Sequence, residues 1–226
     1  MAEIIEKILP NVASHPERFF NGFVETFIMV IWTGSISFVL GIVFGITLTV
    51  TKKGAILENR IIYQILDKLI NLFRSIPFII LLTGVMPLSR LIMGTAIGVR
   101  GAIVPLVFGC VPFFSRQVET ALAEVDGGLI EAAESMGLDP FDIIFRVYLR
   151  ESIGPLVRGT TITLVSLIGL TAMAGAVGAG GLGNYAIMYG HDRNQLDVTR
   201  LTIVVLVIVV NLIQAGGKKI VKKNRH

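Results

Sequence analysis

The stretch TFIMVIWTGSISFVLGIVFGITLTVT, residues 26–51, contains no charged side chain. A helix that crosses the ~30 Å hydrocarbon core of a bilayer needs about 20 mostly apolar residues, so this stretch is long enough for one membrane span. Working outward from it, further uncharged runs cover residues 75–89, 101–115, 159–190 and 201–217. With flanking residues borrowed for the shorter runs, the pattern predicts five spans near residues 26–50, 70–89, 97–115, 157–177 and 199–216.

The composition of the 226-residue chain points the same way. Hydrophobic residues make up 53% of the chain and charged residues 16%, whereas a soluble domain has about 25% charged residues. Cys110 is the only cysteine in the sequence, which excludes a secreted scaffold held together by disulfides. The predicted fold class is therefore an all-α integral membrane protein.

A helix with two different faces precedes the second predicted span. Its polar side consists of Tyr63, Gln64, Asp67, Lys68 and Asn71. Its apolar side consists of Ile61, Ile62, Ile65, Leu66, Leu69, Ile70 and Phe73. This spacing predicts an amphipathic helix that runs into the membrane, and the alternative is a segment that lies along the membrane surface.

The distribution of Lys and Arg predicts the orientation, because short cytoplasmic loops are enriched in both. Residues 218–226 are basic and contain no acid, whereas the first 25 residues carry four acids and two bases. An odd number of spans then places the N-terminus outside and the C-terminus in the cytoplasm. We expect an extracytoplasmic segment (1–19), a transmembrane domain (20–217) and a basic cytoplasmic tail (218–226) whose lysines contact anionic membrane lipid. Basic inner loops explain the net charge of +4 without a nucleic-acid partner.

Residues 116–158, between the third and fourth predicted spans, are here called the acidic loop, because they contain eight acids and four bases. Gly137 predicts the end of one short helix, and Asp139-Pro140 predicts the start of another. The second helix is expected to have an apolar face formed by Phe141, Ile144, Phe145 and Tyr148. A structured loop of this length predicts a docking surface for a cytoplasmic partner, and the alternative is a packed connector.

The acidic loop resembles a known signature. Glu131-Ala132-Ala133, three residues, Gly137, nine residues and then Val147-Tyr148-Leu149 are similar to the EAA motif of ABC importer permeases. Val147 stands where that motif usually has Ile, and Arg150 stands where it has Pro. Two further segments are similar to the methionine-type importers: Phe73-Arg74-Ser75-Ile76-Pro77-Phe78 and the glycine-rich block of residues 175–183.

The resemblance covers roughly residues 20–215 and implies a permease subunit of a methionine ABC importer, with a type I transmembrane domain in a bacterial inner membrane. It implies a homodimer with two cytoplasmic ATPase subunits and an extracytoplasmic methionine-binding lipoprotein, and methionine or close analogues such as D-methionine as substrate. ATP would be bound by the partner, since the chain has no Walker A loop. We therefore expect no cofactor in this chain and no enzymatic activity of its own.

The resemblance also suggests roles for particular residues. Glu131, Ala132, Ala133, Gly137 and Leu138 are expected to couple the chain to the ATPase, with the two alanines presenting a low-profile face. The expected translocation path includes Thr163, Ser166, Thr171 and Met173, and Met173 is expected to act as the gate. Arg74 and Pro77 are expected to begin the core helix. The glycines expected to allow close packing and turns are Gly175, Gly178, Gly180, Gly181 and Gly183.

Other functions find less support in the sequence. Gly178, Gly180 and Gly183 match a dinucleotide-binding pattern by letter, but that site requires a strand before the glycines. The three histidines are scattered, so no metal ligand set and no catalytic residue is predicted. A secondary transporter or channel would need ionisable residues within the membrane, and spans one, four and five have none at their centres. An ABC permease for another small solute remains the other alternative.

Overall fold

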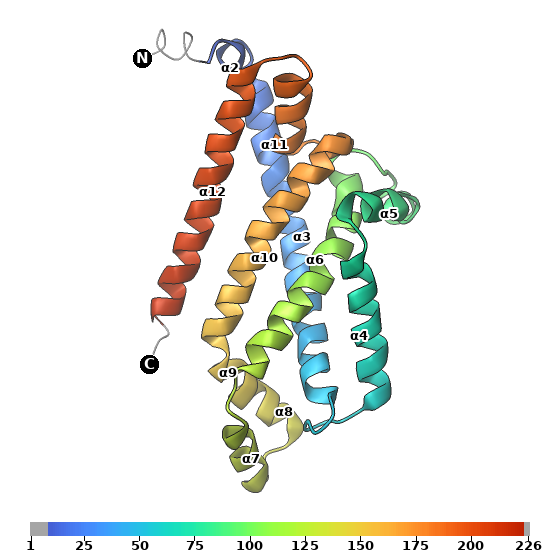
Figure 1. Ribbon diagram of the computed structural model, residues 1–226, viewed down its shortest axis with the longest axis vertical. Coiled ribbons are helices and arrows are strands. Elements are labelled where there is room, and N and C mark those ends of the chain that lie inside the picture. The colour runs from blue at the N-terminus through green and yellow to red at the C-terminus, as the bar shows by residue number, and fades with distance from the viewer. Residues whose placement is uncertain (1–8, 224–226) are drawn as a thin grey trace. The chain divides into compact units, whose positions relative to one another are not determined.

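The computed structural model describes residues 9–223, which form helices joined by short connections, with no strand in that range (Figure 1). The longer helices are α3 (Pro16–Thr51), α4 (Arg60–Ser75), α5 (Phe78–Met93), α6 (Gly98–Ala123), α10 (Ile153–Ala174) and α12 (Leu196–Lys223). The shorter elements are α2 (Pro10–Ser14), α7 (Gly127–Ser135), α8 (Pro140–Asp142), η1 (Ile143–Tyr148), α9 (Leu149–Glu151), η2 (Gly175–Ala179), α11 (Gly181–Asn184) and η3 (Tyr185–His191).

Four of the helices are long and apolar enough to cross a membrane: α3, α6, α10 with η2, and α12. They contain the first, third, fourth and fifth spans that the uncharged runs predicted. α6 extends to Ala123, well beyond the predicted end at residue 115, and α12 continues through the lysines of the predicted tail to Lys223. Residues 1–8 of the predicted outer segment and 224–226 of the tail lie outside the described residues.

The second predicted span differs from expectation because it is not one helix. α4 ends at Ser75 and α5 begins at Phe78, and the two are bent by 112° at the break. Pro77 is the cause, since proline has no N–H to donate and its ring pushes the preceding residue out of the helical conformation. Pro77 itself adopts φ −55° and ψ 133° and caps α5. By length and composition, the described residues therefore contain four candidate spans, or five if this bent pair counts as one.

The chain forms two compact units. Within the described residues, the first comprises 9–35, 76–109 and 164–213, and the second comprises 36–75, 110–163 and 214–223. In the first unit, α2 packs beside the beginning of α12 (Figure 1), where the side chain of Asp197 accepts hydrogen bonds of 2.9 Å from the backbone N–H and the side-chain amide of Asn11. Val12, Tyr185 and Val198 form a small core beneath this contact.

In the second unit, α3 and α6 approach closely at two glycines. A Cβ on Gly41 would lie 2.5 Å from the ring of Phe114, and one on Gly45 would lie 2.5 Å from Cβ of Val118. Glycines four residues apart let two helices pack with little space between their backbones. Phe114 and Val118 continue into a buried core that includes Leu122 of α6 and residues of the acidic loop.

Candidate functional site

The first helix of the acidic loop, α7, is closed at both ends by local hydrogen bonds. At its start, the side chain of Asp126 accepts a 2.8 Å hydrogen bond from the N–H of Gly128. At its end, Gly137 has a φ of +80°, its N–H donates to the carbonyl of Glu134, and the N–H of Leu138 donates to the carbonyl of Ala133. This is the Schellman pattern. The last residue of α7 is Ser135 and its C-cap is Met136, so Gly137 is confirmed as the predicted helix terminator.

The second helical segment, α8 with η1, begins as predicted but buries a different face. Asp139 caps it by accepting a 2.9 Å hydrogen bond from the N–H of Asp142. Residues 143–148 then form π-helical turns, which change the angular spacing of the side chains. Ile144 and Tyr148 are buried as expected, but Phe141 is 71% exposed and Phe145 is 63% exposed. The four residues predicted to form one apolar face are therefore divided between the core and the surface.

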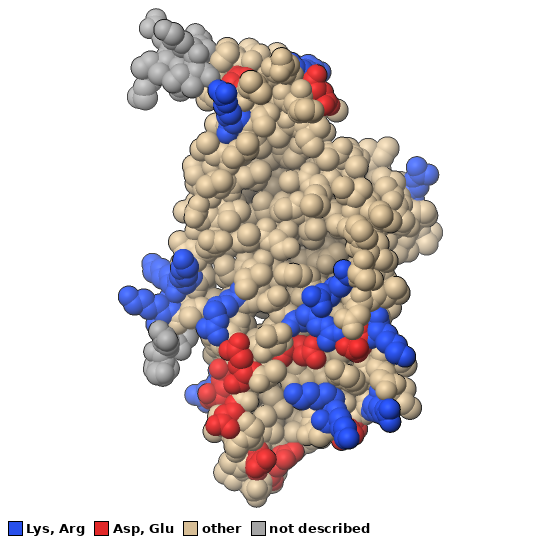
Figure 2. Space-filling model, in the orientation of Figure 1, with Lys and Arg blue, Asp and Glu red and all other residues tan. Residues whose placement is uncertain are grey.

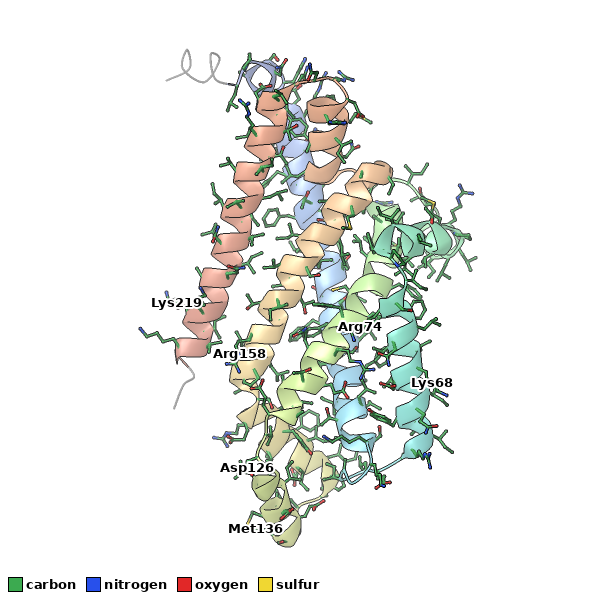
Figure 3. The ribbon with its side chains drawn as sticks, viewed as in Figure 1. Lys68, Arg74, Asp126, Met136, Arg158 and Lys219 are labelled. Atoms are coloured by element: carbon green, nitrogen blue, oxygen red, sulfur yellow. The ribbon has the colours of Figure 1, made fainter. Side chains whose placement is uncertain are left out.

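Within α7, the two alanines point in different directions. Ala133 is 2% exposed and packs in the core with Ile143 and Tyr148, so the expectation that it presents an outward face is wrong. Leu138 packs against the same core. Glu131, Ala132 and Gly137 are exposed, and Met136, at the end of α7, is 72% exposed (Figure 3).

Two regions of the acidic loop differ in charge balance. Near the ends of α6 and α10, Arg158 pairs with Glu124 at 3.1 Å, and in the second segment Arg146 pairs with Asp142 at 2.9 Å. Among the described residues, Glu131 and Glu134 of α7 form no ion pair. Figure 2 shows acidic side chains gathered over this part of the chain, with basic side chains next to them. The exposed end of α7 therefore combines unpaired carboxylates with apolar Met136, a combination suited to a partner that is basic and partly apolar.

Tyr148 lies in the core that α7 and η1 share, together with Ala133 and Ile143. It is buried, and burial raises the pKa of its phenol, with the nearby carboxylate of Glu134 raising it further. The phenol therefore stays neutral at physiological pH, and the core under α7 and η1 holds no charge from this residue.

The residues expected to line a path on α10 fall into two groups. Thr163 and Thr171 are buried, and their hydroxyls donate to the carbonyls of Gly159 and Ile168 on the same helix. Ser166 is half-buried, and Met173 is exposed. The exposed residues Gly169 and Met173 follow Ser166 at helical spacing on α10. These three residues, here called the α10 stripe, lie on a face of α10 that the protomer leaves at least partly uncovered, whereas the two threonines are buried.

The glycine-rich block after α10 behaves as predicted, through both turns and close packing. Gly178, Gly180 and Gly181 have φ between +79° and +90°, in the region that favours glycine. A Cβ on Gly175 would lie 2.5 Å from the backbone nitrogen of Asn184, and one on Gly183 would lie 2.3 Å from the carbonyl oxygen of Ala172. This segment, residues 175–183, is here called the glycine break, because the helix of α10 ends there and a short helix, α11, follows.

Arg74 and Pro77 flank the bend between α4 and α5. Arg74 is exposed at the end of α4 (Figure 3), and Pro77 starts α5. The polar side of α4, which also carries Lys68, is held to α6 by Arg116. Arg116 donates hydrogen bonds to the side chains of Asp67 and Asn71, the latter at 2.9 Å, and pairs with Glu119. The four residues of this network lie in the second unit, where the network fixes the polar face of the amphipathic helix.

Sequence reasoning missed the exposed apolar residues around α7. The candidate coupling residues did not include Met136, Phe141 or Phe145, yet all three are largely exposed. One signal was present: Phe141 and Phe145 are four residues apart and so share a face of the helix that Asp139 caps. Their exposure could not be read from this spacing, since it depends on the π-helical turns that follow. A contact between α3 and the glycine break was missed as well.

Among residues 9–223, no group of three His, Cys, Asp or Glu side chains lies close enough to hold a metal ion. The candidate site residues lie on two separate surfaces, one on the acidic loop in the second unit and one on the α10 stripe in the first unit.

Comparison with known proteins identifies relatives along most of the chain. Residues 37–223 match the family described as binding-protein-dependent transport system inner membrane component. The probable D-methionine transport system permease protein MetI of Vibrio cholerae is 44% identical over 202 residues, covering 89% of this chain and 90% of that protein. The D-methionine transport system permease protein MetI of Escherichia coli K12 is 46% identical over 146 residues, covering 65% of this chain and 67% of that protein.

Solved structures of ABC transporters contain chains with a similar fold. A chain from the structure described as inward facing conformations of the MetNI methionine ABC transporter is 42% identical, with a TM-score of 0.90 and full coverage of both chains. A chain from an amino acid ABC transporter with histidines is only 13% identical, with a TM-score of 0.78 over 95% of this chain and 98% of that chain. The second likeness concerns the fold alone.

Proposed function

Because the chain belongs to the family of binding-protein-dependent transport system inner membrane components, we propose that it carries methionine, and close analogues such as D-methionine, across a bacterial cytoplasmic membrane. The chain is the permease subunit of an ABC importer. The observation that carries the choice of substrate is 44% identity over 89% of the chain to a relative named for D-methionine transport. The absence of ionisable residues at the centres of α3, α10 and α12 is consistent with a substrate whose side chain is apolar.

The proposed assembly contains two copies of this chain, two ATPase subunits and an extracytoplasmic binding protein. It is supported by the likeness to a chain of the MetNI methionine ABC transporter. The basic end of α12 and the acidic N-terminal residues favour a cytoplasmic C-terminus and an outer N-terminus. ATP hydrolysis belongs to the separate ATPase subunit in this assembly, which leaves the permease to provide the path and the contact surface.

In this function the exposed end of α7 receives the ATPase. Glu131 offers a carboxylate for a charge-assisted hydrogen bond to a basic residue, and Met136 offers an apolar anchor that is 72% exposed. Ala133 and Leu138 hold α7 on the core with Tyr148 and Ile143, so movement of α7 is passed to α6 and η1. Gly137 lets the chain turn sharply at this point.

The path itself is assigned to the α10 stripe. Ser166, Gly169 and Met173 lie on the face of α10 that the protomer leaves uncovered, so two copies facing each other would enclose it. Met173 is flexible and fills irregular space, which suits a gate. Thr163 and Thr171 remain in the proposal as residues that shape the helix behind this face, since their hydroxyls are already bonded to α10 carbonyls.

A paired measurement tests the coupling surface. Gly137→Val and Glu131→Arg should leave the chain in the membrane at normal levels, measured by blot, but should abolish methionine uptake and reduce the ATPase recovered per permease after detergent extraction. Glu151→Arg is the matched control, because Glu151 is an exposed acid of the same loop that lies in α9 and not in α7. Full uptake with full ATPase recovery in both test variants would place the docking surface elsewhere.

Competition experiments test the substrate. Uptake of radiolabelled methionine into cells or proteoliposomes should be inhibited by unlabelled L- and D-methionine and only weakly by lysine or glutamate. Better inhibition by lysine or glutamate than by methionine would contradict the proposed substrate and leave the permease assignment intact.

Cysteine labelling tests the orientation. In a Cys110→Ala background, Lys223→Cys should react with a membrane-impermeant maleimide only after the cells are opened. Reaction from outside intact cells would contradict the proposed topology.

A further inference from the structure

The glycine break leaves backbone groups that need partners. α10 ends at Ala174, and Val177 and Gly178 depart from helical geometry within η2. α11 then begins at Gly181, and the first N–H groups of a helix have no acceptor within it. In an apolar setting such groups must find another acceptor, because an unpaired buried N–H is costly.

Two adjacent residues of α3 supply these acceptors. The carboxylate of Glu25 accepts a 2.7 Å hydrogen bond from the N–H of Gly181, and the hydroxyl of Thr26 accepts a 2.8 Å hydrogen bond from the N–H of Leu182. Both bonds join positions 156 residues apart in the chain. The same Thr26 hydroxyl donates to the carbonyl of Gly22, so it is used as both donor and acceptor.

The contact is also tightly packed. A Cβ on Gly180 would lie 2.6 Å from a carboxylate oxygen of Glu25, and one on Gly181 would lie 2.8 Å from the hydroxyl of Thr26. On the other side, a Cβ on Gly22 would lie 3.3 Å from the backbone of Gly181. All of these residues belong to the first unit, so the contact between this part of α3 and the glycine break lies within one compact unit.

The hydrogen bond to Gly181 gives a reason for an acidic residue at position 25. After it, α3 contains no further charged residue through Thr51. An ionisable side chain on a membrane-spanning helix is expensive and calls for a partner. Among the described residues, Glu25 has no ion pair, and its bond to the Gly181 N–H is the one that accounts for the carboxylate being there.

We propose that Glu25, with Thr26, is a positioning residue for the gate, and that it acts by holding the glycine break against α3. The inference rests on the proposed function, since it concerns the path along α10. Met173 is the second-last residue of α10, so the break that Glu25 holds sets where the end of the α10 stripe lies. Neither Glu25 nor Thr26 contacts substrate in this role; both act through the backbone of residues 180–182.

The first test measures the position of the gate without any need for substrate. In the intact transporter with Cys110→Ala and Met173→Cys, the rate of maleimide labelling at position 173 is compared with and without a change at Glu25. Glu25→Ala should change that rate by about tenfold, the effect expected on an equilibrium from loss of one charge-assisted hydrogen bond. Glu25→Gln keeps an oxygen that accepts from the Gly181 N–H, and its rate should stay within about twofold of the parent, because a neutral hydrogen bond retains part of the energy.

The second test measures transport in proteoliposomes. Glu25→Ala should raise the leak of methionine without ATP and the ATPase activity without binding protein, while ATPase recovery on extraction stays normal. Thr26→Val should act in the same direction, and Thr26→Ser should resemble the parent. Thr202→Val is the matched control, because Thr202 is also buried and donates to a carbonyl of its own helix. Glu17→Ala is a second control, because it removes another acidic side chain of α3, in the first turn of the helix.

The outcomes separate the two proposals. Equal labelling of position 173 in the parent, Glu25→Ala and Thr26→Val would overturn the positioning role, whatever the substrate. Equal disruption by Glu25→Ala and Glu25→Gln would also overturn it, since the hydrogen-bond acceptor would then be irrelevant. Altered labelling with rescue by glutamine, in a transporter that does not carry methionine, would support the positioning role and contradict only the proposed substrate. If Glu25→Ala does not accumulate in the membrane, Thr26→Val and Glu25→Gln decide the question.

Discussion

The glycine break and the end of α7 both depend on glycine, but for different physical reasons. At the break, a Cβ on Gly183 would lie 2.3 Å from the carbonyl oxygen of Ala172, which is backbone and has little freedom to move. At the end of α7, Gly137 has a φ of +80° and nothing lies within 4 Å of a Cβ placed there. The first glycine is required by space, and the second is required by backbone conformation alone.

This difference matches what each region does in the proposed function. The break belongs to a packed part of the first unit, tied to α3 by two hydrogen bonds. The end of α7 is an open corner that must receive a partner, so empty space around Gly137 is expected. Gly183 is therefore needed for close packing of the backbone, whereas Gly137 is needed for a turn at an exposed surface.

The largest effect is expected for Gly183→Ala. The added methyl group would overlap backbone atoms of Ala172, and overpacking of this kind costs about 3 kcal/mol or more. We expect strongly reduced membrane abundance by blot and a lower melting temperature of the purified protein. Gly178→Ala is the matched control, because Gly178 has a φ of +90° but open space around its Cβ position, so only the conformational cost applies. An equal loss of membrane abundance and melting temperature in both variants would show that lack of space at Gly183 adds nothing to the conformational cost.

A second large effect tests whether a glycine of the second unit is also required because a Cβ would not fit there. A Cβ on Gly45 would lie 2.5 Å from Cβ of Val118 and 2.8 Å from the carbonyl of Ser115. Gly45→Ala should therefore destabilise the protein by about 2 kcal/mol, measured as a shift in thermal unfolding. Val118→Ala in the same chain should recover part of the loss by making room. A Gly45→Ala protein with unchanged melting would show that α3 and α6 can separate without penalty.

At Gly137 the expected effect is smaller. Gly137→Ala should cost about 1 kcal/mol, because alanine is disfavoured at positive φ, and the chain should still accumulate in the membrane. Gly137→Asn should cost less, since asparagine tolerates this conformation better than other residues. Hydrogen exchange of the amides of residues 136–138 reports the local change. Loss of membrane abundance in Gly137→Ala, comparable to that in Gly183→Ala, would mean that the corner is packed after all.

The smallest effect is expected for the ion pair at the edge of the acidic loop. Arg158 and Glu124 are 3.1 Å apart, and each side chain is 53% exposed. Exposed pairs contribute about 0–1 kcal/mol, so Arg158→Gln should change the melting temperature very little. Arg116→Gln is the comparison, because Arg116 is 17% exposed and bridges α6 to Asp67 of α4. A larger loss for Arg158→Gln than for Arg116→Gln would contradict the assignment of the packed network to Arg116.

Much of the fold could be predicted because its causes are local. The absence of charge over residues 26–51 and 201–217 is enough to specify helices that span a membrane. The end of α7 could be predicted because Gly137 acts on its own turn, and the start of α8 because Asp139 caps the next three residues. The exposed position of Glu131 and Ala132 also agrees with the candidate surface read from the motif.

Other features were decided by contacts between distant parts of the chain. Periodicity predicted one apolar face that includes Phe141 and Phe145 together with Tyr148. In the structure, with the π-helical turns of η1, Tyr148 is buried and the two phenylalanines are exposed. The motif treated Ala132 and Ala133 alike, whereas the core buries only Ala133. Pro77 was expected to begin the core helix within one span over residues 70–89, but α4 and α5 meet at this point with a bend of 112°.

The sequence by itself determined which segments are helical, where they enter an apolar phase, and which corners turn, because charge, hydrophobicity, proline and glycine act over a few residues. Only the tertiary structure decided that Glu25 and Thr26 hold residues 181 and 182, which lie 156 positions away. A hydrogen bond depends on distance in space, and no local pattern states which distant N–H will lie within reach of a given carboxylate.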